Sequence, residues 1–183
     1  MARIVLVTGG GRSGKSSYAL QLGTSLPGPR AFLATCPRID GEMRQRILEH
    51  QQERASPNWC TIEEPLNVAR LLASERQYQV VLVDCLALWV NNLMHEAAQA
   101  GHELQEEDIR RLCGEMLARS GERPGTVIFV TNEVGMGIIP DNALARRYRD
   151  LLGRCNQVMA AGAETVILMT CGIPLTLKTG ANP

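Results

Sequence analysis

The segment Gly9-Gly10-Gly11-Arg12-Ser13-Gly14-Lys15-Ser16 has the residue types and the spacing of a loop that binds phosphate groups. It fits the pattern G-x-x-x-x-G-K-[ST], in which glycines let several backbone N–H groups point inward at phosphate oxygens. A helix that begins at Lys15 or Ser16 adds the positive end of its dipole. We expect Lys15 to reach the β- and γ-phosphates of a nucleotide, and the Ser16 hydroxyl to ligate Mg²⁺.

Asp84 is a second candidate, because it ends the apolar run 80–83. In P-loop proteins a carboxylate at such a strand end holds Mg²⁺, directly or through water. We expect it close to the phosphate loop, because the first and third predicted strands, 4–8 and 80–83, are commonly placed side by side in this fold. The alternative is an acid that caps a helix or lies solvated at the strand end.

His50 lies on a polar predicted helix, 42–54, together with Arg46 and Arg54. A neutral imidazole can attack a phosphorus centre and form a phosphoramidate, and nearby arginines can bind phosphate oxygens. A lone surface histidine usually has no such role. The residues by themselves therefore favour a solvated side chain, and the nucleophile is the alternative.

A loop of polar residues and glycines, TNEVGMGIIP at 131–140, follows another predicted strand at its carboxyl end. This composition suits a loop that faces a ligand, and it suits a turn into the next helix equally well. The next helix carries a basic cluster on its polar side: Arg146, Arg147, Arg149 and Arg154. For this cluster a solvated face or a subunit contact is favoured over substrate binding.

Short apolar runs alternate with helical patterns along the chain. The runs predict strands at 4–8, 31–34, 80–83, 126–131 and 165–170, with a candidate edge strand at 175–178. The helical patterns cover 16–22, 42–54, 65–76, 109–117 and a long stripe over 144–159, capped by Asp141 or Asn142 and followed by Gly162. The stretch 91–106 is predicted to be a loop or a frayed helix with solvated His95 and His102. The alternation indicates a single α/β domain, 1–183, of the P-loop NTPase (RecA-like) class, with a mostly parallel sheet flanked by helices.

The composition excludes several function classes. The chain has 183 residues with 19 basic and 19 acidic side chains, which argues against binding nucleic acid or an anionic membrane by bulk charge. The longest apolar stretch, 80–90, contains Asp84 and is too short to span a membrane. The six cysteines are scattered without a C-x-x-C pair, which is typical of small buried side chains in a reducing compartment. We therefore expect a cytoplasmic protein.

Several segments resemble the bifunctional adenosylcobinamide kinase/adenosylcobinamide-phosphate guanylyltransferase family. They are TGGGRSGKS at 8–16, DGEMRQRILEH at 40–50, WCTIEEP at 59–65, TNEVGMGIIPDNALARRYRD at 131–150 and GIPLTLK at 172–178. The resemblance covers nearly the whole chain, and the 131–150 block and the helix before His50 are far more specific than the phosphate loop.

The resemblance implies a two-step role in cobalamin synthesis. A nucleoside triphosphate, ATP or GTP, first phosphorylates the hydroxyl of the aminopropanol arm of adenosylcobinamide. GMP is then transferred from GTP to that phosphate, giving adenosylcobinamide-GDP and pyrophosphate. In the family this second step passes through a guanylylated histidine, which corresponds to His50 here. Because the imidazole must be neutral to attack, guanylylation should weaken as the pH falls through its pKa.

The resemblance also assigns site residues and an assembly state. It implies that His50 and Lys15 are catalytic residues and that Ser16 and Asp84 are metal ligands. It also implies that the chain assembles as a homotrimer. The nucleotide contacts it implies are Thr8, Gly9, Gly10, Gly11, Arg12, Ser13, Gly14, Lys15, Ser16, Ala34, Thr35, Cys36, Gln51, Gln52, Glu53, Arg54, Glu63 and Asp84.

Two positions depart from the family pattern, and two other functions compete with this one. Asp84 stands where some members have Glu, and Gln51 where many have a basic residue; the stretch 91–107 matches nothing firm. A P-loop kinase for another small metabolite would explain Lys15 and Asp84 but would leave His50 without a role. A nucleotide-dependent switch without enzymatic activity would bind no corrinoid.

Overall fold

A central sheet organises the protein, whose computed structural model describes residues 2–36 and 59–180. The sheet has seven strands in the order β3-β2-β4-β5-β1-β6-β7. They are β1 (Arg3–Gly9), β2 (Arg30–Ala34), β3 (Trp59–Glu63), β4 (Val80–Asp84), β5 (Thr126–Val130), β6 (Thr165–Thr170) and β7 (Ile173–Thr179). The first six strands are parallel, and β7 pairs antiparallel with β6. The α/β fold with a mostly parallel sheet is confirmed.

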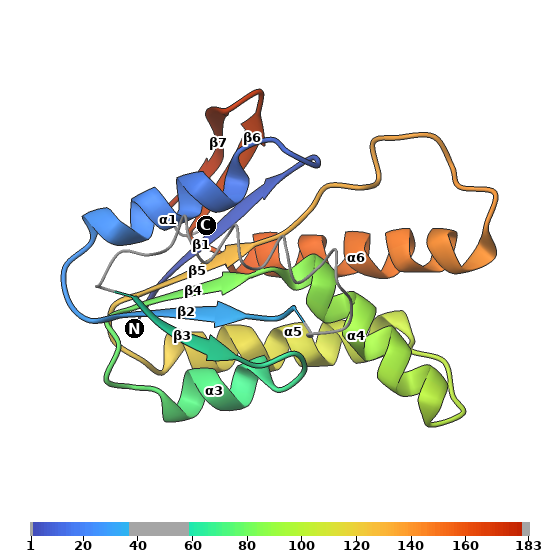
Figure 1. Ribbon diagram of the computed structural model, residues 1–183, viewed down its shortest axis with the longest axis horizontal. Helices are drawn as coiled ribbons and strands as arrows, with labels where there is room; N and C mark the ends of the chain where they lie inside the picture. Colours follow the sequence, from blue (N-terminus) through green and yellow to red (C-terminus); the bar gives the residue numbers. More distant parts are fainter. Residues whose placement is uncertain (1, 37–58, 181–183) are drawn as a thin grey trace.

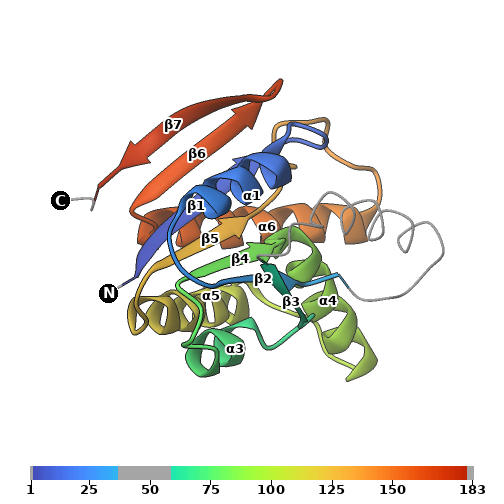
Figure 2. The same cartoon turned by 60° about the vertical axis from the view of Figure 1, so that its left-hand side comes forward.

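Helices cover both faces of this sheet (Figures 1 and 2). The helices in the described part of the chain are α1 (Lys15–Ser25), α3 (Val68–Ser74), α4 (Leu86–Gln99), α5 (Glu106–Gly121) and α6 (Ala143–Gly162). Helix α1 packs on one face, against β1, β4 and β5. Helix α5 contacts both α3 and α6, and the three form a layer on the opposite face. The arrangement leaves the carboxyl ends of the parallel strands along one edge, where such folds bind ligands.

The middle of the sheet is the most deeply buried part of the core. Every residue of β5 is buried, and Val7, Val83 and Val130 have no exposed surface at all. These strands are covered by helices on both faces, which explains why they are continuous apolar runs rather than alternating patterns. The same runs allowed β1, β4, β5 and β6 to be predicted from the sequence.

The position of β5 corrects one prediction. Strands β1 and β4 are not neighbours, because β5 lies between them and pairs with both. The apolar runs of the three strands are equivalent in pattern, so nothing in the sequence distinguishes the middle one. The consequence is that the loop after β5, and not only Asp84, opens beside the phosphate loop.

The structure also corrects the prediction for the segment that forms helix α4. The stretch 91–106 was predicted as a loop or frayed helix, but α4 runs from Leu86 to Gln99 and carries His95 on its surface. Its first turns are apolar and directly follow β4, so they appeared to continue the strand's apolar run. The buried amide of Asn92 donates to the carbonyl oxygens of Thr35, at 2.8 Å, and Pro65, at 3.0 Å. That buried side chain explains why a polar-looking segment forms a packed helix.

Strand β3 and some helix ends also differ from the predictions. No strand was predicted between 34 and 80, whereas Trp59 begins an edge strand whose side chains are mostly exposed and so lack an apolar run. Helix α1 continues through Gly23 to Ser25. In α6, Asn142 is confirmed as the N-cap, because its side chain accepts a hydrogen bond from the Ala145 N–H at 3.1 Å. Gly162 is the last residue of that helix instead of the residue after it.

The six cysteines, which all lie in the described residues, form no disulfide, but they are not uniformly buried. Cys85, Cys113 and Cys155 lie in the core, whereas Cys60 and Cys171 are exposed, so the expectation of burial is wrong for these two. Within the described ranges, no helix combines the length and the apolar character needed to span a membrane.

Candidate functional site

The loop between β1 and α1 curls tightly around its own backbone. Ser13 N donates to Gly10 O at 3.3 Å, and Gly14, in the left-handed region with φ 89°, is the N-cap of α1. No side chain caps this helix, so its first N–H groups remain available to an anion. Because α1 begins at Lys15, the lysine and Ser16 lie in its first turn, as the motif predicts.

Gly9 is required by close packing. It has φ +156°, and a Cβ built there would lie 2.5 Å from Met169 O and 2.6 Å from Ser13 Oγ. A Cβ at Gly10 or Gly11, in contrast, would meet no protein atom within 4 Å. The protein itself therefore needs a glycine at position 9, whereas positions 10 and 11 face open space that a phosphate can occupy.

We expect Gly9→Ala to lower the free energy of unfolding by about 2 kcal/mol or more, since the β6 backbone must move to admit the methyl group. Thermal unfolding without nucleotide would measure this. Gly10→Ala is the matched control and should unfold at the wild-type temperature. Equal unfolding temperatures for the two variants would contradict the packing argument.

The Lys15 side chain folds over the loop. Its ammonium donates to Gly10 O at 3.0 Å. Burial lowers the pKa of Lys15, while the neighbouring Cys85 and Asp84 act in the opposite direction. Burial also raises the pKa of the Cys85 thiol to about 12, so this thiol is neutral near pH 7. The negative charge that faces Lys15 at neutral pH is therefore the Asp84 carboxylate, which places the acid and the lysine in one site.

Three of the predicted nucleotide contacts end neighbouring strands. Ala34 of β2 is paired with Glu63 of β3 on one side and with Asp84 of β4 on the other. Asp84 is in turn paired with Val130, the last residue of β5. These residues form one row along the carboxyl edge of the sheet, as expected for a ligand site in a parallel α/β fold.

Thr35 is completely buried behind this row. Its hydroxyl donates to Cys85 O at 2.7 Å and accepts from Cys85 N at 2.8 Å, and its N–H donates to Asp84 O at 3.2 Å. The side chain thereby holds the backbone that carries Asp84. Asn92, which the sequence did not indicate, holds Thr35 from the other side.

Two further segments touch the phosphate loop. Glu133, just after β5, donates its N–H to Gly9 O at 3.0 Å, and Gly172, in the turn between β6 and β7, donates to Ser13 O at 3.1 Å. The 131–140 segment is thus placed beside the loop, which favours the ligand-facing interpretation over a mere turn.

Unpartnered polar atoms gather at the same place. Among the described residues, four buried side-chain polar atoms lack a hydrogen-bond partner, and three of them belong to Thr8, Ser13 and Asn132. Native proteins contain few such atoms, and a cluster of them indicates a ligand or water. The edge between β1 and β5 is therefore suited to a polar ligand.

A family model described as cobinamide kinase / cobinamide phosphate guanyltransferase matches residues 5–177. The chain belongs to this family. The resemblance noted in the sequence is therefore confirmed, and the protein is a bifunctional kinase and guanylyltransferase.

Relatives match over nearly their whole lengths. The chain is 41% identical to the bifunctional adenosylcobalamin biosynthesis protein CobP of Pseudomonas aeruginosa over 177 residues, which cover 94% of this chain and 96% of the relative. It is 37% identical to the bifunctional adenosylcobalamin biosynthesis protein CobU of Escherichia coli, with 96% and 99% covered, and 36% identical to CobU of Salmonella typhimurium, with the same coverage.

A solved structure supports the fold alone. The KaiC-like protein PH0186 from Pyrococcus horikoshii superposes with a TM-score of 0.53 at 16% identity, covering 91% of this chain and 70% of that chain. Its resemblance agrees with the P-loop, RecA-like class.

The described part of this family member contains only some of the predicted site. His50, Gln51, Gln52, Glu53 and Arg54 lie outside the described residues. Cys36, the last residue before that gap, is partly buried. The phosphate loop, Asp84 and Glu63 lie along the carboxyl edge of the sheet or next to it, whereas the nucleotide contacts assigned to them stay predictions.

The basic cluster of α6 has a structural role that its pattern did not reveal. Arg147 pairs with Glu103 and donates to Leu104 O at 2.7 Å, and Arg154 pairs with Glu106 at 2.7 Å. Arg146 donates to the carbonyl oxygens of Pro140, at 2.9 Å, and Asp141, at 2.6 Å. These three arginines tie α6 to the α4–α5 connection, to the first residue of α5 and to the segment after β5. The face of α6 that carries these arginines is therefore not purely solvated.

Proposed function

We propose that this enzyme carries out two successive transfers with one phosphate loop, first as a kinase and then as a guanylyltransferase, in the synthesis of adenosylcobalamin. The observation that carries the proposal is the site formed by the phosphate loop, Lys15 and Asp84 at the carboxyl edge of the sheet. Family membership supplies the substrate, a cobinamide. The names of the relatives, which specify adenosylcobalamin biosynthesis, support the biosynthetic setting.

In the kinase step, the hydroxyl oxygen of the aminopropanol arm attacks the γ-phosphorus of ATP or GTP. The bond between the γ-phosphorus and the β,γ-bridging oxygen breaks, the nucleoside diphosphate leaves, and the hydroxyl proton is released. Lys15 and the backbone N–H groups of the loop bind the β- and γ-phosphates and stabilise the charge that develops there. The uncapped first turn of α1, together with Lys15 over the loop, supports this role because it leaves N–H groups and a cation for the phosphates.

In the second step, a neutral imidazole nitrogen of His50 attacks the α-phosphorus of GTP, and pyrophosphate leaves. A phosphate oxygen of the cobinamide phosphate then attacks the same phosphorus. The phosphorus–nitrogen bond breaks, and adenosylcobinamide-GDP forms with a free histidine. We assign the pyrophosphate to the phosphate loop, since it consists of the same β- and γ-phosphoryl groups that the loop binds in the kinase step.

Two side chains suit a magnesium ion. Ser16 offers a hydroxyl in the first turn of α1, and Asp84 offers a carboxylate at the end of β4. Mg²⁺ at nucleotide sites takes few protein oxygens, with phosphates and water completing its shell, so this donor set fits. When bound, the ion would neutralise charge on the β- and γ-phosphates.

Incubation of the enzyme with cobinamide, Mg²⁺ and γ-³²P-labelled ATP or GTP tests the first transfer. The label should move to the coloured corrinoid fraction, and the α-label of GTP should follow in the second transfer. A parallel reaction with EDTA should stop both. A corrinoid that never acquires label, in reactions where the nucleotide is bound, would overturn the proposal.

We further propose a cytoplasmic homotrimer, which the family resemblance implies. The absence of disulfides among the six cysteines, all of which lie in the described residues, is consistent with a reducing compartment. The edge strand β7 supports association, because Ile173, Leu175 and Leu177 are exposed large apolar side chains on it. Light scattering during gel filtration should give about three times the chain mass of 20.0 kDa. A monomer at micromolar concentration would contradict the trimer.

A further inference from the structure

Exposed apolar side chains are concentrated in two segments of the described chain. One segment is β7, and the other runs from the end of β5 to the first turn of α6. The second contains Val134, Met136, Ile138, Ile139 and Leu144. Met136 is 84% exposed and Ile138 is 96% exposed. Single exposed apolar residues are ordinary, but five within eleven residues indicate a surface that binds something.

This apolar segment is anchored at both ends while its side chains face outward. At the start, Glu133 N donates to Gly9 O of the phosphate loop, and Glu133 Oε1 accepts from Gly135 N at 2.9 Å. At the far end, Arg146 holds the carbonyl oxygens of Pro140 and Asp141. In Figures 1 and 2 the segment passes the turn between β1 and α1 before it reaches α6.

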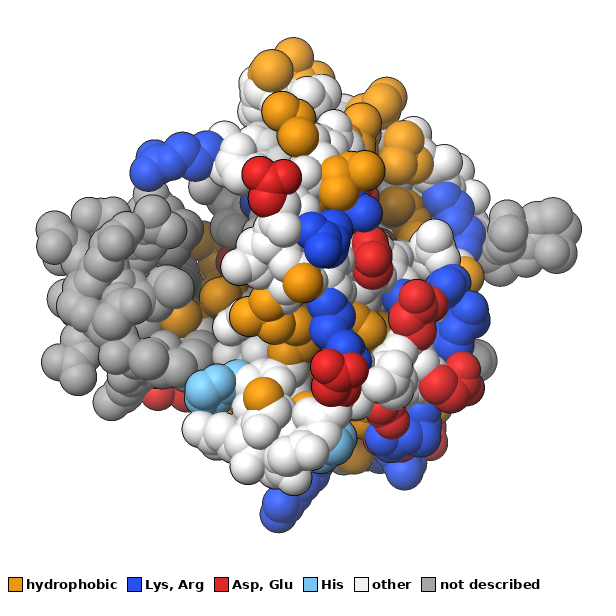
Figure 3. Space-filling model, turned by 90° about the vertical axis from the view of Figure 1, so that its right-hand side faces the viewer, with side chains coloured by type: hydrophobic (Ala, Val, Ile, Leu, Met, Phe, Trp, Pro, Cys, Tyr) orange, Lys and Arg blue, Asp and Glu red, His pale blue; other side chains and the backbone are white. Residues whose placement is uncertain are grey.

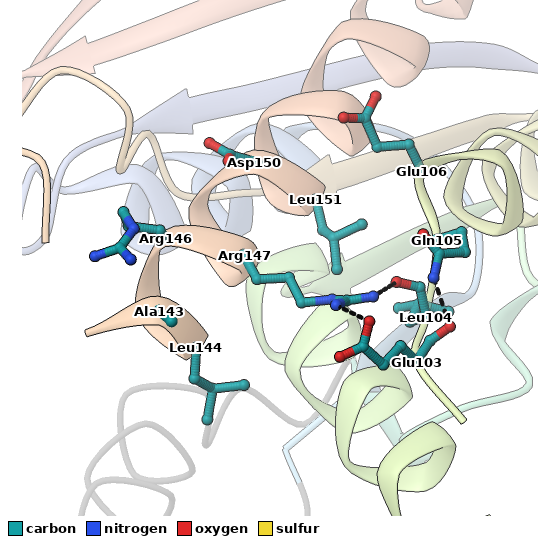
Figure 4. Close-up of a pocket in the computed structure, with 10 residues that line it drawn as sticks. All are labelled: Glu103, Leu104, Gln105, Glu106, Ala143, Leu144, Arg146, Arg147, Asp150 and Leu151. Atoms are coloured by element: carbon teal, nitrogen blue, oxygen red, sulfur yellow. Dashed lines mark hydrogen bonds and ion pairs between the residues drawn. The ribbon is translucent and has the colours of Figure 1, made fainter. Parts of the chain in front are cut away.

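A hollow continues the surface from Leu144. It has a volume of about 570 Å³, within the range of small-molecule sites, and lies between the start of α6 and the α4–α5 connection. Figure 4 shows Leu144 and Leu151 in its lining beside the paired Arg147 and Glu103. Figure 3, which faces the end of the molecule where α6 begins, shows hydrophobic and charged side chains interleaved on this side. The surface therefore combines the apolar side chains of the segment with the mixed lining of the hollow.

The kinase reaction constrains where the acceptor can lie. The hydroxyl that receives phosphate sits on a short arm of cobinamide, so the macrocycle must rest close to the phosphate loop when the arm reaches the γ-phosphate. A corrin ring is a flat macrocycle edged with methyl groups and amide arms, and it needs a surface that is apolar with polar groups at its border. We propose that Met136, Ile138, Ile139 and Leu144 bind the macrocycle of the corrinoid acceptor, with the adjoining hollow receiving its amide arms. The proposal rests on the cobinamide activity of the family.

The test compares two double variants of the full chain. Met136→Ser with Ile138→Ser removes the most exposed apolar area, while Met136→Leu with Ile138→Leu retains it. Equilibrium dialysis with cobinamide, read by its visible absorbance, and the KM for cobinamide in the kinase reaction are measured for both. The serine variant should bind cobinamide about tenfold more weakly or worse. The leucine variant should stay within twofold of the wild type, and nucleotide affinity should change less than twofold in either variant.

Three other results would count against the proposal in different ways. A serine variant with wild-type affinity for cobinamide would place the macrocycle elsewhere. Loss of affinity together with a changed molar mass in light scattering would identify the segment as an interface between copies of the chain, and would overturn the proposal. A wild-type protein that binds nucleotide but no cobinamide would contradict the proposed function itself, which separates that failure from an error in the location.

Discussion

Lys15→Met should abolish both transfers, lowering each turnover number by about 10³-fold or more. The Lys15 side chain folds back over the phosphate loop, where its ammonium donates to Gly10 O. Asp84 is a neighbouring acid of this ammonium. Methionine keeps the length of the side chain but removes the charge that stabilises the β- and γ-phosphates in the transition state. Both half-reactions use these phosphates, so a single change should affect both. Steady-state rates of phosphate transfer and of guanylyl transfer measure the effect.

The chain offers a matched control for this experiment. Its other lysine, Lys178, donates to the carbonyl oxygens of Ala160, at 3.1 Å, and Ala161, at 2.9 Å, at the end of α6. Lys178→Met should cost a fraction of a kcal/mol to about 1 kcal/mol in stability and leave both turnover numbers near wild type. If Lys15→Met retained one transfer at full rate, the single-loop proposal would be wrong for that half of the reaction.

His50→Ala should eliminate guanylyl transfer while leaving the kinase step in place. In the proposed mechanism this imidazole is the nucleophile of the second step only, so its removal should leave the kinase step intact. Denatured wild-type protein, after incubation with Mg²⁺ and α-³²P-labelled GTP, should carry a label that is stable to alkali and labile to acid. The variant should carry none, yet it should still phosphorylate cobinamide, which also demonstrates that it is folded.

The remaining two histidines are the controls. His95 lies on α4 and shares a hydrogen bond of 3.0 Å with Gln99, and His102 is exposed in the turn between α4 and α5. Variants with alanine at either position should be labelled like the wild type. A label that survives His50→Ala would assign the intermediate to a different residue, and an unlabelled wild type would favour a kinase without the guanylyltransferase step.

What could be predicted from the sequence follows from how each element is buried. Strands β1, β4, β5 and β6 are covered on both faces, so their apolar runs are continuous and recognisable. The phosphate loop could be placed because its glycines and lysine are specific to one geometry. Strand β3, at the sheet edge and mostly exposed, has no such pattern. Helix α4 was obscured because its apolar first turns follow the apolar run of β4 almost directly.

The sequence revealed which residues belong to the site more readily than how these residues are arranged. The sequence indicated Asp84 but placed its strand directly beside β1, whereas β5 lies between the two strands. The apolar runs of the three strands are equivalent, so their pattern does not reveal the order. The sequence also singled out the segment after β5 without a reason to prefer a ligand. The hydrogen bond from Glu133 to Gly9 supplies that reason, because it places the segment against the phosphate loop. It could not be predicted, because it depends on a strand order that local patterns do not encode.

The position of β1 in the sheet affects how the enzyme is made. The phosphate loop directly follows β1, but β1 must pair with strands that are synthesised much later: with β5, where Arg3 is opposite Thr126, and with β6, where Val5 is opposite Thr165. While the ribosome is still adding the middle of the chain, neither neighbour of β1 exists, and such distant pairings form slowly. Nascent chains that stop before β6 should therefore lack a formed nucleotide site. Residues that are synthesised before most of the sheet thus belong to one of the last parts of the enzyme to take shape.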